Sequence, residues 1–245
     1  MLITSVNNEK IKELVKLKDK KYRDKTNLFF VEGKDLCDEA YNSGILREIY
    51  ILEGQDNIYD EIPYSYITND IMKKISDLSS ITNYYGVCTK KVEEDIGSKI
   101  IILDNIQDPG NLGTIIRSAV AFGFDTVVLS EDTVDMYNPK VIRSTKGMIF
   151  NINIIIRPLD TYLKELKDYT IYGTDVINGI DISKEPIPSK LAIIIGNEGK
   201  GISTQIKQYC KKNIYIKMNN NCESLNAGVS ASIIMYEVYK KWNMF

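Results

Sequence analysis

Six short apolar segments from residue 100 onward constrain the fold of the chain more than any other feature. They read IIIL (100–103), TVVLS (126–130), INIII (152–156), TIYGT (170–174), LAIIIG (191–196) and NIYIKM (213–218). Segments with helical character accompany them at 112–122, 138–147, 159–168, 202–211 and 224–241. Continuous apolar strands that alternate with helices predict a parallel sheet buried on both faces. We therefore expect an α/β fold with a mostly parallel sheet and helices on both faces.

The first 90 residues carry a shorter α/β pattern. Asn7 or Asn8 is placed to cap a helix with one apolar stripe, made of Ile11, Leu14, Val15 and Leu17. Strands are expected at 28–31, 48–52, 64–68 and 84–90, and helices at 34–42 and 69–78. The charged segment KKVEEDIGSK (90–99) is typical of a linker. We predict a small α/β domain over 1–92, a linker over 93–99 and a larger domain over 100–245.

The composition excludes several kinds of chemistry. The 245-residue chain contains no histidine, which removes Ser-His-Asp and Cys-His catalysis and histidine metal ligands. Its four cysteines, Cys37, Cys88, Cys210 and Cys222, form no C-x-x-C pair, so we expect reduced thiols and no metal. Any catalysis must use carboxylates, lysine, tyrosine, amides, hydroxyls or arginine.

Charge and hydropathy bear on the partners. No apolar run approaches the roughly 18 residues of a membrane span, and the N-terminus has no apolar signal core, so we expect a soluble, cytoplasmic protein. The net charge of −2 gives no global attraction to nucleic acid, although a local patch suffices for binding. Basic residues are dense near the N-terminus, and they form either an RNA-binding patch or a solvated helix face: Lys10, Lys12, Lys16, Lys18, Lys20, Lys21, Arg23 and Lys25.

The stretch LDNIQDPGNLGTIIRSA (103–119) follows the first of the six apolar segments. Asp108-Pro109-Gly110-Asn111 is a turn signal, and a helix follows it. Arg117 lies in the second turn of that helix, where it opposes the helix dipole. Two interpretations remain open: Arg117 reaches solvent or pairs with Asp104 or Asp108, or it recognises a phosphate.

Two further polar stretches follow other strands. IGNEGKG (195–201) has three glycines but matches neither a P-loop nor G-x-G-x-x-G, and Glu198 within it is either solvated or a ligand group. In IKMNNNCESLNAGVSAS (216–232), Ser224 can cap a helix whose first turns contain only small residues. Gly228 inside that helix costs about 1 kcal/mol relative to alanine, so close packing or a ligand is needed to explain it. Because ligands bind beyond the carboxyl ends of parallel strands, the three stretches together predict one pocket.

In this order and spacing, the three stretches resemble the motifs of the SpoU branch of the SPOUT RNA methyltransferases. DPGNLGTIIRSAVAFG is similar to motif 1, IIIGNEGKGIS to motif 2, and IKM with SLNAGVSASI to motif 3. The segment YNPKVIRSTKGMIF (137–150) also looks like the family's segment between motifs 1 and 2. The resemblance covers 100–245. The first 90 residues look, more loosely, like the small substrate-binding domain of ribosomal RNA members, which is related to a ribosomal-protein fold.

The resemblance implies a sheet with a C-terminal trefoil knot, a homodimer, and S-adenosylmethionine bound by the knotted loops near the dimer interface. It places the cofactor at Gly196, Ile216, Met218 and Leu225. It places the catalytic centre at Asn111, Arg117, Glu198, Ser224 and Asn226. This chain departs from the family at Lys217, where proline is usual, at Ala227, where valine is frequent, and at Lys146, where small or apolar residues are commoner. The loss of the proline bears on cofactor affinity rather than on the chemistry.

The implied activity is transfer of a methyl group to a ribose 2′-oxygen of RNA, with 23S ribosomal RNA as the preferred substrate. Arg117 is expected to hold a phosphate and either to activate the 2′-hydroxyl or to stabilise it electrostatically; since arginine stays charged in proteins, the electrostatic role is preferred. Asn111 and Glu198 would hold its guanidinium, and Ser224 and Asn226 would orient cofactor and ribose.

Three alternatives have arguments against them. A tRNA methyltransferase is disfavoured by the N-terminal domain, since tRNA-type members usually have only short helical extensions. A non-catalytic RNA-binding relative is disfavoured because Asn111, Arg117, Glu198 and Asn226 are all retained. A nucleotide- or NAD-binding enzyme is disfavoured because DPGNLG lacks the G-x-G-x-x-G form.

Overall fold

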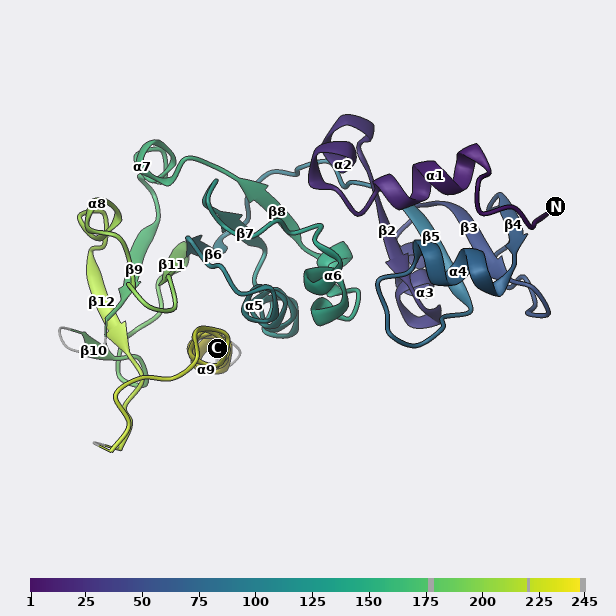
Figure 1. The fold of residues 1–245 in the computed structure, drawn as a ribbon. Coiled ribbons are helices and arrows are strands. Elements are labelled where there is room, and N and C mark those ends of the chain that lie inside the picture. The colour runs from purple at the N-terminus through teal and green to yellow at the C-terminus, as the bar shows by residue number, and fades with distance from the viewer. Residues whose placement is uncertain (176–178, 220, 243–245) are drawn as a thin grey trace. The chain divides into compact units, whose positions relative to one another are not determined.

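The computed structural model of the chain describes residues 1–175, 179–219 and 221–242 (Figure 1). It forms two compact units, neither of them continuous in sequence. The first contains Met1–Val92 and Asp135–Phe150, and the second contains Glu93–Val134 and Asn151–Phe245. The sequence-based division into 1–92, 93–99 and 100–245 did not foresee that residues 135–150 pack with the N-terminal part of the chain.

The first unit is a five-stranded sheet with helices. Its strand order is β1 (Leu2–Ile3), β4 (Tyr64–Ile67), β3 (Leu46–Leu52), β5 (Tyr84–Thr89) and β2 (Leu28–Glu32). The helices are α1 (Glu9–Lys16), α2 (Lys20–Thr26), α3 (Lys34–Asn42), α4 (Asn69–Ile75) and α6 (Pro139–Thr145), and the 3-10 helix η1 spans Met148–Asn151. Asn8 caps α1 by accepting the backbone N–H of Lys10 at 2.9 Å. The predicted apolar stripe lies in the core of this unit, where Ile11, Leu14 and Leu17 are buried.

Two ion pairs fix residues 135–150 in the first unit. Arg23 is buried and pairs with Asp135, and it also donates to the carbonyl oxygens of Leu17 and Lys18. Arg143 on α6 pairs with the buried Glu32 at 3.3 Å. Arg23 is therefore a structural residue, and it does not belong to an exposed basic patch.

The second unit contains a seven-stranded sheet in which all strand pairs are parallel (Figure 1). The strand order is β10 (Ile180–Asp181), β12 (Lys212–Tyr215), β9 (Thr170–Thr174), β11 (Leu191–Gly196), β6 (Lys99–Asp104), β7 (Thr126–Leu129) and β8 (Asn153–Ile156). The predicted parallel sheet is thus confirmed. The strand predicted over 213–218 ends at Tyr215, so Ile216 and Met218 lie in the loop that follows it.

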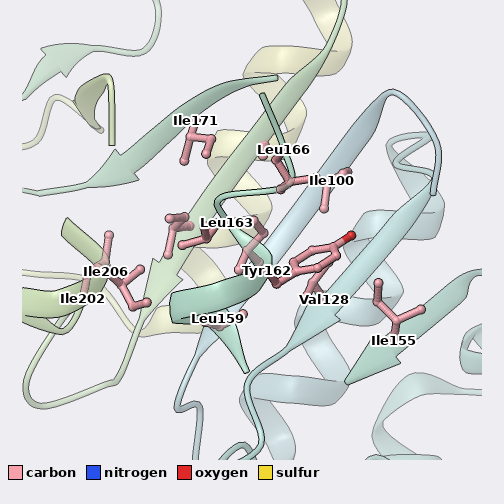
Figure 2. Close-up of a cluster of buried hydrophobic side chains, with 13 residues drawn as sticks. Ile100, Val128, Ile155, Leu159, Tyr162, Leu163, Leu166, Ile171, Ile202 and Ile206 are labelled. Atoms are coloured by element: carbon pink, nitrogen blue, oxygen red, sulfur yellow. The ribbon is translucent and has the colours of Figure 1, made fainter. Parts of the chain in front are cut away.

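Helices cover both faces of this sheet, as predicted (Figure 1). On one face, α7 (Leu159–Tyr162) and α8 (Thr204–Lys207) pack into a buried cluster with alternate strand residues such as Ile100 and Ile102 (Figure 2). Side chains of successive strand residues point to opposite faces, so Ile101 and Leu103 face the other side. There α5 (Pro109–Ala121) packs against α9 (Ala227–Trp242).

The helix ends differ from the predictions at three places. α7 and α8 are single turns, shorter than the helices expected at 159–168 and 202–211. The prediction that Ser224 caps the last helix is wrong. α9 begins at Ala227, and Asn226 caps it through its Oδ1, which accepts the backbone N–H of Val229 at 3.2 Å. Residues 216–219 and 221–226 belong to no helix or strand, so the helix starts later than the small-residue pattern indicated. The trefoil knot stays a prediction.

Neither a membrane-spanning helix nor a cluster of metal-ligating side chains is found among the described residues. Among them, no helix has the length and apolarity needed to cross a membrane. Within the same residues, no group of three or more potential metal-ligating side chains (histidine, cysteine, aspartate or glutamate) comes together.

Candidate active site

A cavity of about 170 Å³ lies at the carboxyl ends of β9, β11 and β12 in the second unit. It brings together all four residues predicted to bind the cofactor, namely Gly196, Ile216, Met218 and Leu225. Two predicted catalytic residues, Glu198 and Ser224, also line it, whereas Asn111, Arg117 and Asn226 are not among its lining residues. Lining residues that the sequence reasoning missed are Thr174, Asp175, Ile195, Asn197, Gly201, Ile214, Tyr215, Ala227, Ser230 and Ile234.

The glycines of IGNEGKG form a turn that folds back onto the end of β11. Asn197 and Gly201 exchange two backbone hydrogen bonds, of 3.1 and 2.9 Å. A Cβ added to Gly196 would lie 2.1 Å from the backbone nitrogen of Ile202, so only glycine fits there. The side chain of Asn197 closes the turn by accepting the N–H groups of Gly199 and Lys200. The glycine turn therefore forms part of the cavity wall.

The carboxylate of Glu198 connects this turn to the beginning of α5. Its Oε1 accepts hydrogen bonds from Nδ2 of Asn111 at 3.0 Å and from the backbone N–H of Asp108 at 3.1 Å. Its Oε2 accepts the N–H of Gln107 at 3.3 Å. Partial burial is the largest single influence on this group and raises its pKa, but the hydrogen bonds from Asn111, Asp108 and Gln107 together outweigh burial. The pKa of Glu198 is consequently lowered, which keeps the carboxylate ionised.

Arg117 lies exposed on α5, and the structure does not bring it to its predicted neighbours. Within the described part of the chain, its guanidinium makes no ion pair and no hydrogen bond. Asn111 and Glu198 bond to each other, so the expectation that they hold the guanidinium is not met. Asp108 caps α5, and Asp104 accepts the N–H of Ser203, so neither pairs with Arg117 either.

The third stretch supplies the remaining wall of the cavity. Ile216, Met218 and Leu225 are half-buried along it, while Ser224 and Asn226 are exposed. Asn220, which the same stretch contains, lies outside the described residues. A Cβ on Gly228 would lie 3.1 Å from Cβ of Thr114 on α5, so close helix packing explains this glycine.

The chemical character of the cavity limits its ligand. Apolar side chains and the bare backbone of Gly196 form much of the lining, and its two charged residues, Asp175 and Glu198, are both acidic. Neither lysine nor arginine occurs among the lining residues that are described. Such a lining suits a ligand with an apolar body and a positive charge, and it is unfavourable for a phosphate-bearing nucleotide. S-adenosylmethionine, which carries a sulfonium charge, fits this description.

The hydrogen bonds of Glu198 predict a pH-dependent loss in a Glu198→Gln variant. At pH 7 the variant should lose about 1 kcal/mol of unfolding free energy, because a neutral amide replaces a hydrogen-bonded carboxylate. Since the pKa of Glu198 is lower in the folded chain than its ordinary value of 4.5, the stabilisation is present above that value and disappears as the pH falls through the folded pKa. Urea unfolding followed by the single tryptophan, Trp242, measures the difference at each pH.

Glu165→Gln, a change of an exposed glutamate in the same unit, is the matched control. The difference between Glu198→Gln and the parent chain should narrow below the ordinary glutamate pKa. A difference that is constant from pH 7 to pH 4, or equal to that of the control, would contradict the assignment.

Comparison with known proteins finds a matching family model for each of the two parts of the chain. Residues 98–236 match the model of the SpoU rRNA Methylase family, and residues 8–82 match the MRM3-like substrate binding domain. The 23S rRNA (guanosine(2553)-2'-O)-methyltransferase RlmP of Bacillus subtilis is 35% identical over 243 residues, which cover 96% of this chain and 98% of the relative. A putative TrmH family tRNA/rRNA methyltransferase of Staphylococcus saprophyticus is 36% identical over 160 residues, 64% of each chain.

Solved structures agree in fold over nearly the full length. A crystal structure of an RNA 2'-O ribose methyltransferase has a TM-score of 0.85 and 26% identity, and the match covers 99% of this chain and 100% of the other. The SpoU methyltransferase AviRb from Streptomyces viridochromogenes, solved in complex with AdoMet, has a TM-score of 0.85 and 21% identity over 97% of this chain and 99% of its own. With a family model that matches more than half of its residues and a full-length relative at 35% identity, this chain belongs to the SpoU rRNA methylase family.

Proposed function

We propose that this chain transfers the methyl group of S-adenosylmethionine to a ribose 2′-oxygen of 23S ribosomal RNA. The observation that carries the proposal is the cavity at the strand ends, which is apolar and acidic inside and contains Gly196, Ile216, Met218 and Leu225 together. Membership of the SpoU rRNA methylase family and the full-length match to RlmP support the reaction and the class of RNA. Ribosomal RNA as substrate is consistent with a cytoplasmic enzyme.

The residues of the cavity fit the cofactor. S-adenosylmethionine supplies an electrophilic methyl group on a positively charged sulfur. The apolar side chains of Ile216, Met218 and Leu225 provide contact area for the adenosine, and Gly196 allows its backbone to come close because no side chain intervenes. The charged side chains of the described lining are both acidic, Glu198 and Asp175, the second of which pairs with Lys207 outside the lining; the absence of a basic residue from the described lining favours a cation.

We assign Arg117 to binding a phosphate of the RNA. Its guanidinium is exposed and unpaired within the described chain, so its donors are available to a phosphate. An arginine binds a phosphate through two parallel hydrogen bonds and stays charged, which also stabilises negative charge that develops on the attacking 2′-oxygen. Asn111, whose amide is held by Glu198, lies two turns earlier on the same helix. Ser224 lies exposed in the loop before α9, and Asn226 lies exposed at the cap of this helix. We assign both residues to orienting the cofactor and the ribose.

Arg117→Ala should reduce methyl transfer to RNA by at least about 100-fold, as is typical when one preorganised donor at a reacting oxygen is removed. Cofactor affinity and folding should stay close to those of the parent chain, because Arg117 neither lines the cavity nor pairs with another described residue. Transfer of tritium-labelled methyl groups to ribosomal RNA measures the rate, and calorimetry with S-adenosylhomocysteine measures the affinity.

The matched control is Arg157→Ala, which removes a half-buried arginine of the same unit, one that pairs with Glu93 at 2.7 Å. It should keep most of the activity. An Arg117→Ala variant with most of its rate intact would overturn the assignment.

We propose that the first unit binds the sugar-phosphate backbone of the RNA. Of the basic residues near the N-terminus, Lys10, Lys12 and Lys18 pair with Glu48, Glu9 and Asp77, and Arg23 is buried. Lys16 lies over the ring of Tyr22 at 5.7 Å. The exposed lysines of α2, namely Lys20, Lys21 and Lys25, have no ion-pair partner among the described residues, and they form the candidate RNA patch.

Reversing two of these charges with Lys20→Glu and Lys21→Glu should weaken RNA binding at low salt by about 10-fold or more. It should also lower the slope of log affinity against log salt, since fewer counterions are released from the RNA. Filter binding of ribosomal RNA at several salt concentrations measures both. Lys164→Glu with Lys167→Glu, a pair of exposed lysines in the second unit, is the control. If the RNA affinity falls equally in both double variants, the assignment of the α2 lysines to RNA binding is wrong.

We also propose that the chain works as a homodimer that pairs through α9. Val229, Tyr236 and Tyr239 are exposed large apolar residues on this helix. Phe122, at the end of α5, packs beside Tyr236 with 5.6 Å between ring centroids and extends the apolar surface. Exposed apolar patches of this kind typically mark a protein–protein contact.

Tyr236→Glu should shift the protein to monomers, because a charge would be buried in the proposed interface. Sedimentation equilibrium over a range of protein concentrations measures the association. Tyr64→Glu alters an equally exposed tyrosine of the first unit and should leave the association unchanged. A parent chain that sediments as a monomer at every concentration would disprove the homodimer.

A further inference from the structure

One hydroxyl group in the wall of the cofactor cavity has no assigned role. Three residues of α9 line this cavity, namely Ala227, Ser230 and Ile234. Their spacing of three and then four residues puts them on one face of the helix, so this face is turned toward the cavity. Ser230 lies on it between the half-buried Ala227 and the buried Ile234, and it is itself half-buried. The side chain of Ser230 therefore points toward the cavity.

The hydroxyl group of Ser230 has no hydrogen-bond partner among the described residues. A serine within a helix commonly bonds to the carbonyl oxygen four residues earlier. Ser232 of the same helix does so: its Oγ donates to the carbonyl oxygen of Gly228 at 2.7 Å, and it also lies 2.7 Å from Oγ of Ser118 on α5. The two serines thus differ, because Ser232 joins α9 to α5 while the hydroxyl of Ser230 is left to the cavity.

Several other polar side chains of the cavity are already used in building its walls. Glu198 accepts hydrogen bonds from the beginning of α5, and Asn197 closes the glycine turn. The hydroxyl of Thr174 donates to the carbonyl oxygen of Ile194 at 3.0 Å. Ser230 has no such structural task, so its hydroxyl is available to a ligand.

The surroundings of Ser230 indicate which part of the cofactor it meets. Its neighbours on the cavity-facing side of α9, Ala227 and Ile234, are apolar, and the buried Ile195 and Ile214 also line the cavity. A charged group in such surroundings would lose its hydration without gaining a partner, which excludes the amino-acid part of S-adenosylmethionine and its sulfonium. Adenine is a flat ring with apolar faces and a polar edge. It is therefore the part of the cofactor that fits beside Ser230.

We infer that the hydroxyl group of Ser230 binds the polar edge of the adenine ring, which makes Ser230 a specificity-determining residue for the cofactor. A serine hydroxyl can donate to a ring nitrogen or accept from the 6-amino group. A few placed polar groups in an otherwise apolar pocket orient a ligand, and a pocket built around a hydrogen bond rejects ligands that cannot form it. The inference rests on the proposed function, because it requires that the cavity bind this cofactor.

Calorimetry on the parent chain and on Ser230→Ala tests the inference. The variant should fold, since alanine is a better helix former than serine. Its affinity should fall about 5-fold both for S-adenosylhomocysteine and for 5′-methylthioadenosine, which lacks the amino-acid part, because one hydrogen bond is lost. Four analogues of 5′-methylthioadenosine then identify the adenine atom: three replace N1, N3 or N7 by a C–H group, and the fourth lacks the 6-amino group. The difference between parent chain and variant should disappear for the analogue without the contacted atom.

The matched control is Ser232→Ala, which changes a half-buried serine of the same helix that is not among the described lining residues. Its affinity for both ligands should equal that of the parent chain. Equal affinities of the parent chain and Ser230→Ala would overturn the inference. A loss confined to S-adenosylhomocysteine would also overturn it, by placing Ser230 at the amino-acid part, and so would a loss that persists with all four analogues. A parent chain that binds neither S-adenosylhomocysteine nor 5′-methylthioadenosine would instead contradict the proposed function.

Discussion

The hydrogen bonds of the Glu198 carboxylate are the interaction on which the rest of the site depends. They join the loop after β11 to the loop after β6, two segments about 90 residues apart in sequence. One of these loops is the glycine turn that forms the cavity wall, and the other leads into the helix that carries Arg117. Because one carboxylate bonds to both loops, it ties the cavity wall to the beginning of the helix that carries Arg117.

The site separates its charges. Among the described residues, the charged side chains that line the cavity are the acidic Asp175 and Glu198, and the guanidinium of Arg117 has no partner and lies exposed on α5. A cationic cofactor and an anionic RNA would therefore each meet a surface of the opposite charge. This arrangement also needs no histidine or metal ion, since the methyl donor is already activated and the protein has to align, orient and stabilise charge.

The sheet and the motifs could be predicted from local patterns, while long-range packing could not. Continuous apolar segments identified the strands of the second unit except the two-residue β10, and turn residues after them identified the cavity. The docking of residues 135–150 depends on Arg23 with Asp135 and on Glu32 with Arg143, pairs separated by 112 and 111 residues, which no local periodicity reveals. Ser224 was predicted to cap the last helix, but Asn226 caps it instead, because α9 begins only at Ala227 and the small-residue pattern does not show where the preceding loop ends. Asp175 was missed because a single aspartate after a strand forms no motif.

The most direct test of the account is the identity of the methylated nucleoside. The purified protein would be incubated with tritium-labelled S-adenosylmethionine and total RNA from a strain that lacks its gene, and the RNA separated by size and digested. The predicted result is label in large ribosomal RNA, recovered as a 2′-O-methylated nucleoside. Label recovered only in tRNA would contradict the assigned substrate, and label on a base, or no label despite cofactor binding, would contradict the proposed chemistry.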